Sequence, residues 1–190
     1  GADRAILVPA REFGGSDTYA TSQILAAAIR KIGLEKDDII LCGRKAIDGD
    51  TAQVGPQIAE KLDIPQVSYA ADIEKNGTTI KVKRMLEDGY MTVTTQTPCL
   101  ITCIKELNQP RYMTVQGIFE SYSKPFEVFD YDALKDDSLV DLTTIGLKGS
   151  PTNIFKSFTP PLKGKGVLLP GADRATCDIL VEQLSAKHLI

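Results

Sequence analysis

Short apolar runs alternate with amphipathic helical segments near the start of the chain, and this alternation limits the possible folds more than any other feature. Residues 5–8 and 39–43 are apolar runs of the kind that parallel sheets bury on both faces. Between them, apolar residues recur at helical spacing, after Ser16 or Asp17 as a capping residue and before a terminating Gly33. This strand-helix-strand order predicts an α/β fold with a doubly wound, mostly parallel sheet and helices on both faces.

The hydrophobic period changes to two between residues 73 and 95, which predicts an antiparallel hairpin added to the sheet. Residues 79–83 and 91–94 alternate apolar and polar side chains, and residues 87–89 supply a turn. Residues 98–103 then return to the pattern of a buried strand.

Beyond Pro110 the hydrophobic pattern becomes irregular, with many Pro, Gly, Ser and Asp residues and scattered aromatic residues, and such a stretch cannot bury a core of its own. We therefore expect residues 111–171 to form an extended arm. One amphipathic helix with Ile179 and Leu180 on its apolar face follows it. We expect two parts: an α/β domain over residues 1–110, and a C-terminal arm and helix over residues 111–190 that lie on a partner subunit.

Charge and hydropathy argue against several classes of protein. The net charge is −3 and no long block of like charges is present, so the sequence does not favour a nucleic-acid partner. No apolar run approaches the roughly 20 residues of a membrane-spanning helix, and the first residues do not resemble a signal peptide. We expect a cytoplasmic protein without membrane insertion. Because Gly1 almost directly precedes a strand, we also expect that an upstream region is missing.

The sequence offers neither a catalytic constellation nor a metal site. None of the four cysteines forms a C-x-x-C pair, and on a strand Cys99 and Cys103 would lie roughly 13 Å apart. They are best interpreted as small buried hydrophobic residues in a reducing compartment. His188, the only histidine, lies too near the C-terminus to anchor a metal site or a nucleophile-histidine couple.

Residues 41–57 carry the chemistry, since they follow a strand that we expect to be central in the sheet, where open α/β sheets bind ligands. Gly43 and Gly49 permit tight turns, and Asp50 and Gln53 have the spacing of a helix cap. A helix start offers N–H groups and a positive dipole end that suit a phosphate.

A second glycine turn and helix start, residues 13–22, would form the facing wall of a crevice, and Arg44 could bind a phosphate with two hydrogen bonds. Neither the P-loop spacing nor G-x-G-x-x-G is present. On these residues alone, an ordinary strand-loop-helix crossing with a solvated acidic loop explains the pattern about as well.

Three motifs resemble one family. Residues 42–57, Cys-Gly-Arg-Lys-Ala-Ile-Asp-Gly-Asp-Thr-Ala-Gln-Val-Gly-Pro-Gln, resemble the adenine-nucleotide loop of electron-transfer flavoprotein β subunits. Residues 82–102 are similar to the family's hairpin signature, with Met91 where an acidic residue or its amide is usual. Residues 107–118 resemble its partner-recognition loop, with Val115 where a leucine is common. The resemblance covers the whole chain and implies that the family's N-terminal region, including its first strand, is absent.

The resemblance implies a Rossmann-like, adenine-nucleotide-binding subunit of one of two types. In one type the β subunit holds a structural AMP. In the other it holds an FAD that accepts hydride from NADH and splits the electron pair between a high- and a low-potential acceptor. Residues 13–22, 49–53 and 148–159 look like the second, bifurcating type. The cofactor-binding residues implied are Asp17, Thr18, Thr21, Cys42, Gly43, Arg44, Ala46, Asp48, Gly49, Asp50, Thr51, Ala52, Gln53 and Val54.

The partners implied are an α subunit, NADH, an acyl-CoA dehydrogenase recognised through Val115, and ferredoxin or flavodoxin as the low-potential acceptor. The chain would then be an electron carrier, redox-active only through the flavin of the heterodimer. Two other hypotheses are a stand-alone nucleotide-binding sensor domain and a structural subunit with a vestigial pocket. The long segment after Pro110 argues against the sensor domain, which would end soon after its last strand.

Overall fold

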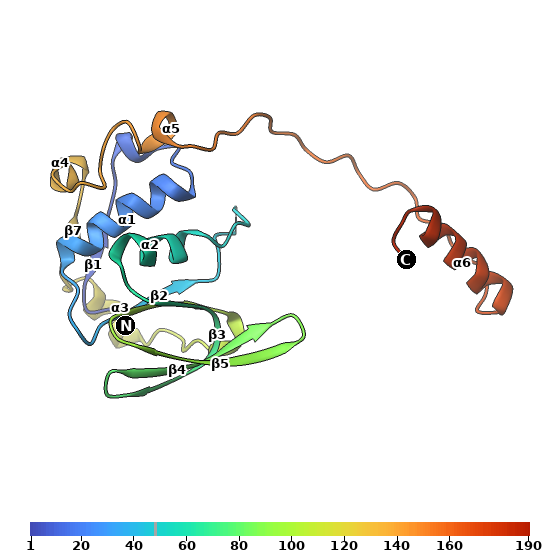
Figure 1. Cartoon of the computed structure of the whole chain (residues 1–190), viewed down its shortest axis with the longest axis horizontal. Helices are drawn as coiled ribbons and strands as arrows, with labels where there is room; N and C mark the ends of the chain where they lie inside the picture. Colours follow the sequence, from blue (N-terminus) through green and yellow to red (C-terminus); the bar gives the residue numbers. More distant parts are fainter. Residues whose placement is uncertain (48) are drawn as a thin grey trace. The chain divides into compact units, whose positions relative to one another are not determined.

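A five-stranded mixed sheet lies at the centre of the computed structural model, which describes residues 1–47 and 49–190 (Figure 1). The strand order is β2-β6-β3-β4-β5. The strands are β2 (Ile39–Gly43), β3 (Gln66–Asn76), β4 (Thr79–Leu86), β5 (Gly89–Gln96) and β6 (Cys99–Cys103). β2, β6 and the start of β3 run parallel, whereas β3, β4 and β5 form an antiparallel meander. The predicted α/β fold with an added hairpin is confirmed.

Strand β2 lies at an edge of this sheet and not at its centre, which corrects the expectation for residues 39–43. Among the described strands β2 pairs with β6 alone, and Leu41 is 61% exposed. An apolar run typical of a strand buried on both faces therefore stands at an open edge in this structure. The run indicates a strand, but only the pairing of the strands decides its place in the sheet.

Helices α1 (Thr18–Ile32) and α2 (Val54–Leu62) lie on the same side of the sheet (Figure 1). Ala26 of α1 and Ile58 of α2 share a buried cluster with Leu100 of β6. The other main cluster of the sheet consists of strand residues only, among them Val82 and Ile101, because the antiparallel strands curl beneath the parallel ones. In the described residues, strands cover this second face in place of the helices expected there.

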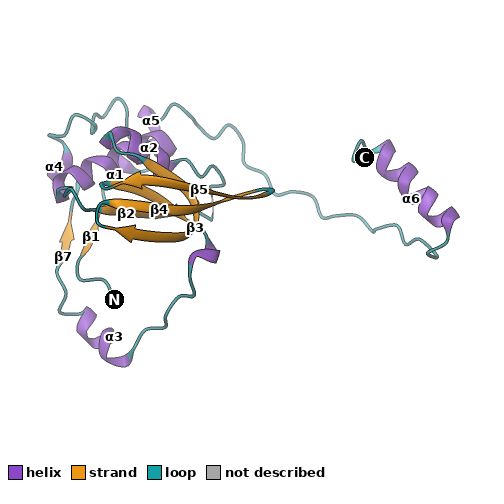
Figure 2. Ribbon diagram, turned by 60° about the horizontal axis from the view of Figure 1, so that its bottom comes forward, coloured by secondary structure: helices purple, strands orange, loops and turns teal. Residues whose placement is uncertain are grey.

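A small second sheet pairs β1 (Ala5–Leu7) with β7 (Phe126–Val128) in parallel (Figure 2). The segment after β7 packs back on α1, where Phe129, Leu134, Val140 and Ile145 join Ile24 and two alanines of the helix in one buried cluster. Short helices α4 (Tyr131–Leu134) and α5 (Gly146–Gly149) lie in this segment.

The chain divides into two compact units, Gly1–Asn153 and Ile154–Ile190, a division that differs from the expected boundary after residue 110. The reason is that β7 pairs with β1 and that the segment after β7 buries its apolar side chains on α1. The second unit begins with residues 154–171, which form no helix or strand, and ends in α6 (Arg174–Ala186), the predicted C-terminal helix. No helix among the described residues is long and apolar enough to cross a membrane.

A network of hydrogen bonds fastens the segment around α5 to the turn that precedes α1. The Gly146 N–H donates to the Ser16 hydroxyl at 3.0 Å, and the Ser150 hydroxyl accepts from the backbone N–H of Asp17 at 2.8 Å. Gly146 adopts φ +66°, and a Cβ atom there would collide with the carbonyl oxygen of Glu12. The turn before α1 is therefore positioned by residues about 130 positions away in the chain.

We expect Gly146→Ala to lower the free energy of unfolding by about 2 kcal/mol or more. Alanine disfavours the left-handed backbone of this position, and its methyl group would push the carbonyl of Glu12 away. Urea denaturation measures this difference. Gly164→Ala is the matched control, since a Cβ at Gly164 meets no atom within 4 Å. Equal stability of the two variants would show that α5 does not hold the turn.

Candidate functional site

A cavity of about 610 Å³ lies where the starts of α1 and α2 meet the carboxyl end of β2. All but two of the predicted cofactor-binding residues line it. Asp50 does not, and Asp48 lies outside the described residues. The predicted residues that line it are Asp17, Thr18, Thr21, Cys42, Gly43, Arg44, Ala46, Gly49, Thr51, Ala52, Gln53 and Val54. Its volume is within the range of small-molecule and cofactor sites.

Asp17 forms the N-cap of α1, as one of the two predicted capping residues. Its Oδ1 accepts from the N–H of Ala20 at 2.9 Å, and its Oδ2 accepts from the N–H of Thr152, also at 2.9 Å. One carboxylate thus begins the helix and binds the segment that follows α5. This double contact places the first turn of α1, with Thr18 and Thr21, at the cavity wall.

The start of α2 differs from the prediction, because Gln53 and not Asp50 is its N-cap residue. Gln53 has helical backbone angles and makes no side-chain cap hydrogen bond, so no side chain at the N-cap occupies the first-turn N–H groups of α2. Ala52, at φ +54°, turns the chain into the helix. The helix start that faces the cavity therefore has backbone donors for an anion.

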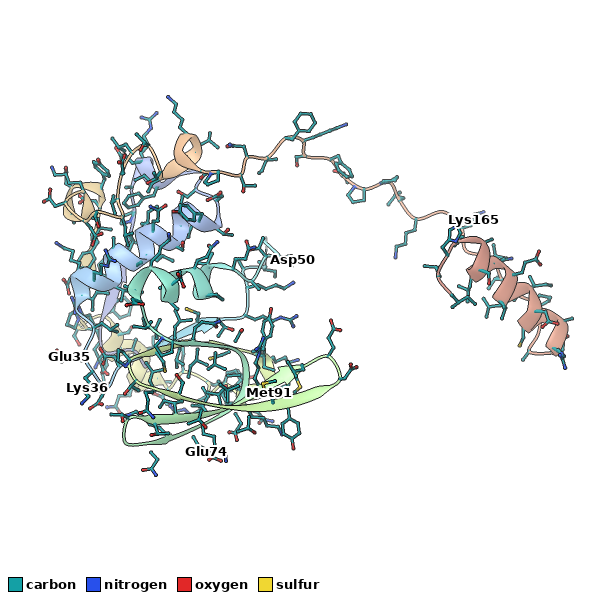
Figure 3. All side chains as sticks on the ribbon, viewed as in Figure 1. Glu35, Lys36, Asp50, Glu74, Met91 and Lys165 are labelled. Carbon is teal, nitrogen blue, oxygen red and sulfur yellow. The ribbon has the colours of Figure 1, made fainter. Side chains whose placement is uncertain are left out.

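Asp50 forms a hydrogen-bonded ion pair with Lys45 of the same loop, and Figure 3 shows it on the loop between β2 and α2. The hydrogen bond and the charge of Lys45 lower the pKa of the Asp50 carboxyl below its usual value. The folded pKa is depressed, so the pair is intact above the ordinary carboxyl pKa and is lost only as the pH falls through the lowered one. The cap predicted from the spacing of Asp50 and Gln53 is therefore wrong, because the Asp50 carboxylate binds Lys45 and not a helix N–H group.

One hydrogen bond joins the two walls of the cavity: the Thr18 hydroxyl donates to Oε1 of Gln53 at 3.2 Å. Both side chains are exposed enough to exchange this contact for one with a ligand. The bond links the first turn of α1 to the cap of α2, 35 residues further along the chain. The predicted crevice between the two turns is thus present in the structure.

The floor of the cavity is apolar and depends on a glycine. A Cβ at Gly55 would lie 2.9 Å from Cγ2 of Thr102 and 3.5 Å from Cβ of Cys42, so only glycine lets α2 approach the sheet this closely. Burial raises the pKa of the Cys42 thiol, and the nearby Cys103 adds to the shift. Cys42 is therefore a neutral thiol at physiological pH and not a nucleophile.

The cavity combines an apolar floor with the positive charges of Arg44 and Lys45, of which Lys45 is paired with Asp50. Such a site can hold a ligand that carries a phosphate on a flat, largely apolar body. No group of three His, Cys, Asp or Glu side chains in the described part of the chain could bind a metal ion. Positioned donors, and not an acid-base pair, are what this arrangement provides.

Sequence reasoning missed five residues that line the cavity: Ser16, Leu25, Lys45, Gly55 and Ile58. Leu25 and Ile58 fit the apolar pattern of a helix, but a helical period does not show which end of an apolar face borders a cavity. Gly55, next to Pro56 at the start of α2, was the strongest available signal, because a glycine in a helix usually has a packing reason.

Val115, the predicted recognition residue, does not line this cavity. It is the first residue of the short helix α3 (Val115–Ser121), and 73% of its surface is exposed. Phe119 of the same helix is equally exposed, at 73%. Val115 is thus accessible to a partner and begins a short helix instead of lying on a loop, and its recognition role stays a prediction.

Comparisons with known proteins agree on one family. The family model of the electron transfer flavoprotein domain matches residues 1–134. The chain is 65% identical over 191 residues to the acryloyl-CoA reductase electron transfer subunit gamma of Anaerotignum propionicum, covering 100% of this chain and 72% of that protein. It is 47% identical over 191 residues to the caffeyl-CoA reductase-Etf complex subunit CarD of Acetobacterium woodii, covering 100% and 71%. It is 50% identical over 190 residues to the electron transfer flavoprotein subunit beta of Thermoanaerobacterium thermosaccharolyticum, covering 100% and 71%.

We expect Asp17→Ala to lower the free energy of unfolding by about 1–2 kcal/mol, because it removes the N-cap of α1 together with the acceptor for Thr152. Chemical denaturation followed by circular dichroism measures the change. Asp50→Ala is the matched control, since this carboxylate pairs with Lys45 and caps no helix. A loss of stability in Asp50→Ala equal to that in Asp17→Ala would contradict this assignment of the cap.

Proposed function

The chain belongs to the electron transfer flavoprotein family as a β subunit, and on that basis we propose that it holds the adenine-nucleotide half of an FAD in the cavity between α1 and α2. The observation that carries the proposal is that the uncapped start of α2 and Arg44 line one cavity, whose facing wall is the first turn of α1. N–H groups at a helix start and a guanidinium both favour phosphate oxygens. The wall opposite these donors comes from the first turn of α1, where Thr18 lies 35 positions before Gln53, so the meeting of the two walls is a property of the fold.

In this proposal the residues of the chain bind and orient the cofactor. The uncapped first turn of α2 and Arg44 hold the phosphates, while Thr18 and Gln53 exchange their mutual hydrogen bond for contacts with the ligand. The apolar floor around Cys42 excludes water from one side of the nucleotide. When bound, the flavin supplies the redox chemistry, which explains why the site requires no general acid or base.

An α subunit is the proposed permanent partner, packed on the arm that comprises residues 154–171 and α6. This arm carries large apolar side chains that are exposed in the chain by itself, including Phe155, Phe158, Leu162 and Leu168. Exposed apolar surface of this extent is typical of a segment that another protein covers. The arm belongs to the second compact unit, so the nucleotide cavity does not depend on it for its described walls.

The proposed reaction is electron bifurcation: with FAD bound in the cavity, the heterodimer would oxidise NADH and deliver the electrons separately to an acyl-CoA dehydrogenase and to ferredoxin or flavodoxin. The names of two relatives support the first acceptor, because they connect electron-transfer subunits with acryloyl-CoA and caffeyl-CoA reductases. Both names pair the relative with a reductase of an acyl-CoA substrate. A partner of the acyl-CoA dehydrogenase type suits such a substrate.

The number of flavins per heterodimer tests the proposed function. The full-length subunit would be purified with its α subunit, the flavin and AMP contents measured, and NADH added anaerobically. We expect two FAD molecules per heterodimer and bleaching of flavin absorbance by NADH. One FAD with one AMP, and no reduction by NADH, would replace the proposal with a carrier that holds AMP as a structural ligand.

We expect Val115→Ala to slow electron transfer to the acyl-CoA dehydrogenase by roughly tenfold, because burial of one valine side chain in a partner's pocket contributes about 1.5 kcal/mol. NADH oxidation with an artificial dye should not change. Val128→Ala, in β7 and half exposed, is the control for a truncated valine elsewhere. If both rates fall and the melting temperature drops, Val115 has a structural role and the recognition assignment fails.

A further inference from the structure

Tyr69 has a backbone conformation that bulky residues rarely adopt. Its φ is +61° in the interior of β3, where extended angles are the rule. Left-handed angles cost free energy at any residue with a Cβ, and they persist only where surrounding contacts enforce them. A strained non-glycine residue inside a strand therefore requires a specific cause.

The cause of the strain is a break in the pairing of β3. Val67 pairs with Ile101 of β6 and Ala70 pairs with Cys103, with a shift in register between them that leaves Tyr69 outside the ladder. The Tyr69 N–H donates to the Thr102 hydroxyl at 3.0 Å instead of to a backbone carbonyl. Irregularities of this kind change the direction of a side chain and are frequent beside functional sites.

The ring of Tyr69 lies against the guanidinium of Arg44, with the Arg44 Cζ 5.2 Å from the ring centroid. This is the distance of a cation–π contact. Arg44 lines the nucleotide cavity and Tyr69 does not, so the ring reaches the cavity only through the arginine. Thr102 connects the same two regions, because its hydroxyl accepts from Tyr69 and its methyl group lies beside Gly55 at the floor of the cavity.

We infer that Tyr69 is a positioning residue, whose strained backbone presents its ring as a platform that aims Arg44 at a phosphate of the bound nucleotide. An arginine on an exposed loop has many rotamers, and fixing it before binding reduces the entropy lost when it meets the ligand. The ring restrains the guanidinium through its face and so does not itself occupy the N–H groups that Arg44 would donate to phosphate oxygens. The inference rests on the proposed function, because it needs a nucleotide phosphate in the cavity.

The test compares AMP with adenosine as probes on the full-length heterodimer after removal of exchangeable nucleotide. We expect Tyr69→Leu, which keeps the bulk and removes the π face, to weaken AMP binding by about twofold to fivefold, the range of a cation–π contact at an exposed site. Tyr69→Phe should bind AMP as the wild type does. Adenosine affinity should be the same in all three proteins, because adenosine has no phosphate for Arg44.

A double-mutant cycle separates positioning from general structure. Arg44→Ala should weaken AMP binding selectively, and in that background Tyr69→Leu should have no further effect. Tyr69→Asn is a second variant that tolerates the left-handed backbone and lacks the ring, so it should lower AMP affinity as Tyr69→Leu does even if the leucine variant folds poorly. A matching loss of adenosine and AMP affinity in Tyr69→Asn would overturn the inference, because it indicates a structural role alone.

The cycle also distinguishes this inference from the function on which it rests. Suppose that the wild type binds AMP, that Arg44→Ala weakens AMP binding, and that neither Tyr69→Leu nor Tyr69→Asn changes it. Tyr69 then has no positioning role, while the proposed nucleotide site is retained. If the wild type binds neither AMP nor adenosine, the proposed function fails and the inference with it.

Discussion

Small side chains along α1 let this helix pack against two hydrophobic clusters at once. Ala27 and Ala28 lie in the cluster with Phe129, whereas Ala26 lies in the cluster with Leu100 of the main sheet. A larger side chain at any of the three alanines would move the helix away from one of its two supports. Because the first turn of α1 is a wall of the cavity, the geometry of the candidate site depends on this close packing.

The two helix starts at the cavity are built differently, and the difference suits their roles. The carboxylate of Asp17 closes the start of α1 by accepting hydrogen bonds from the helix and from Thr152. The start of α2 has no side-chain cap at Gln53, and Gly55 lets its first turn approach the sheet. The first helix is thus a rigid wall, while the second has donors available for an anion.

Two residues with left-handed backbone lie at or beside the same cavity. Ala52, which lines the cavity, has a left-handed backbone conformation, and so has Tyr69, whose ring contacts Arg44. Contacts from elsewhere in the fold enforce such conformations, because they are unfavourable in an isolated chain. Packing in the hydrophobic clusters therefore offsets the unfavourable backbone conformations of these two residues at the site.

The sequence by itself determined the local elements, because hydrophobic period and capping residues act over a few positions: α1 with Asp17 and Gly33 at its ends, the hairpin, and the loop after β2. Only the tertiary structure decided that β2 lies at an edge and that the segment after β7 belongs to the first unit. The apolar residues of that segment follow no regular period, so their burial appears only when α1 provides the complementary face. The same reason explains the misplaced cap at Asp50 and the unforeseen role of Tyr69. Both depend on which side chains meet in space, here Lys45 and Arg44, and not on spacing along the chain.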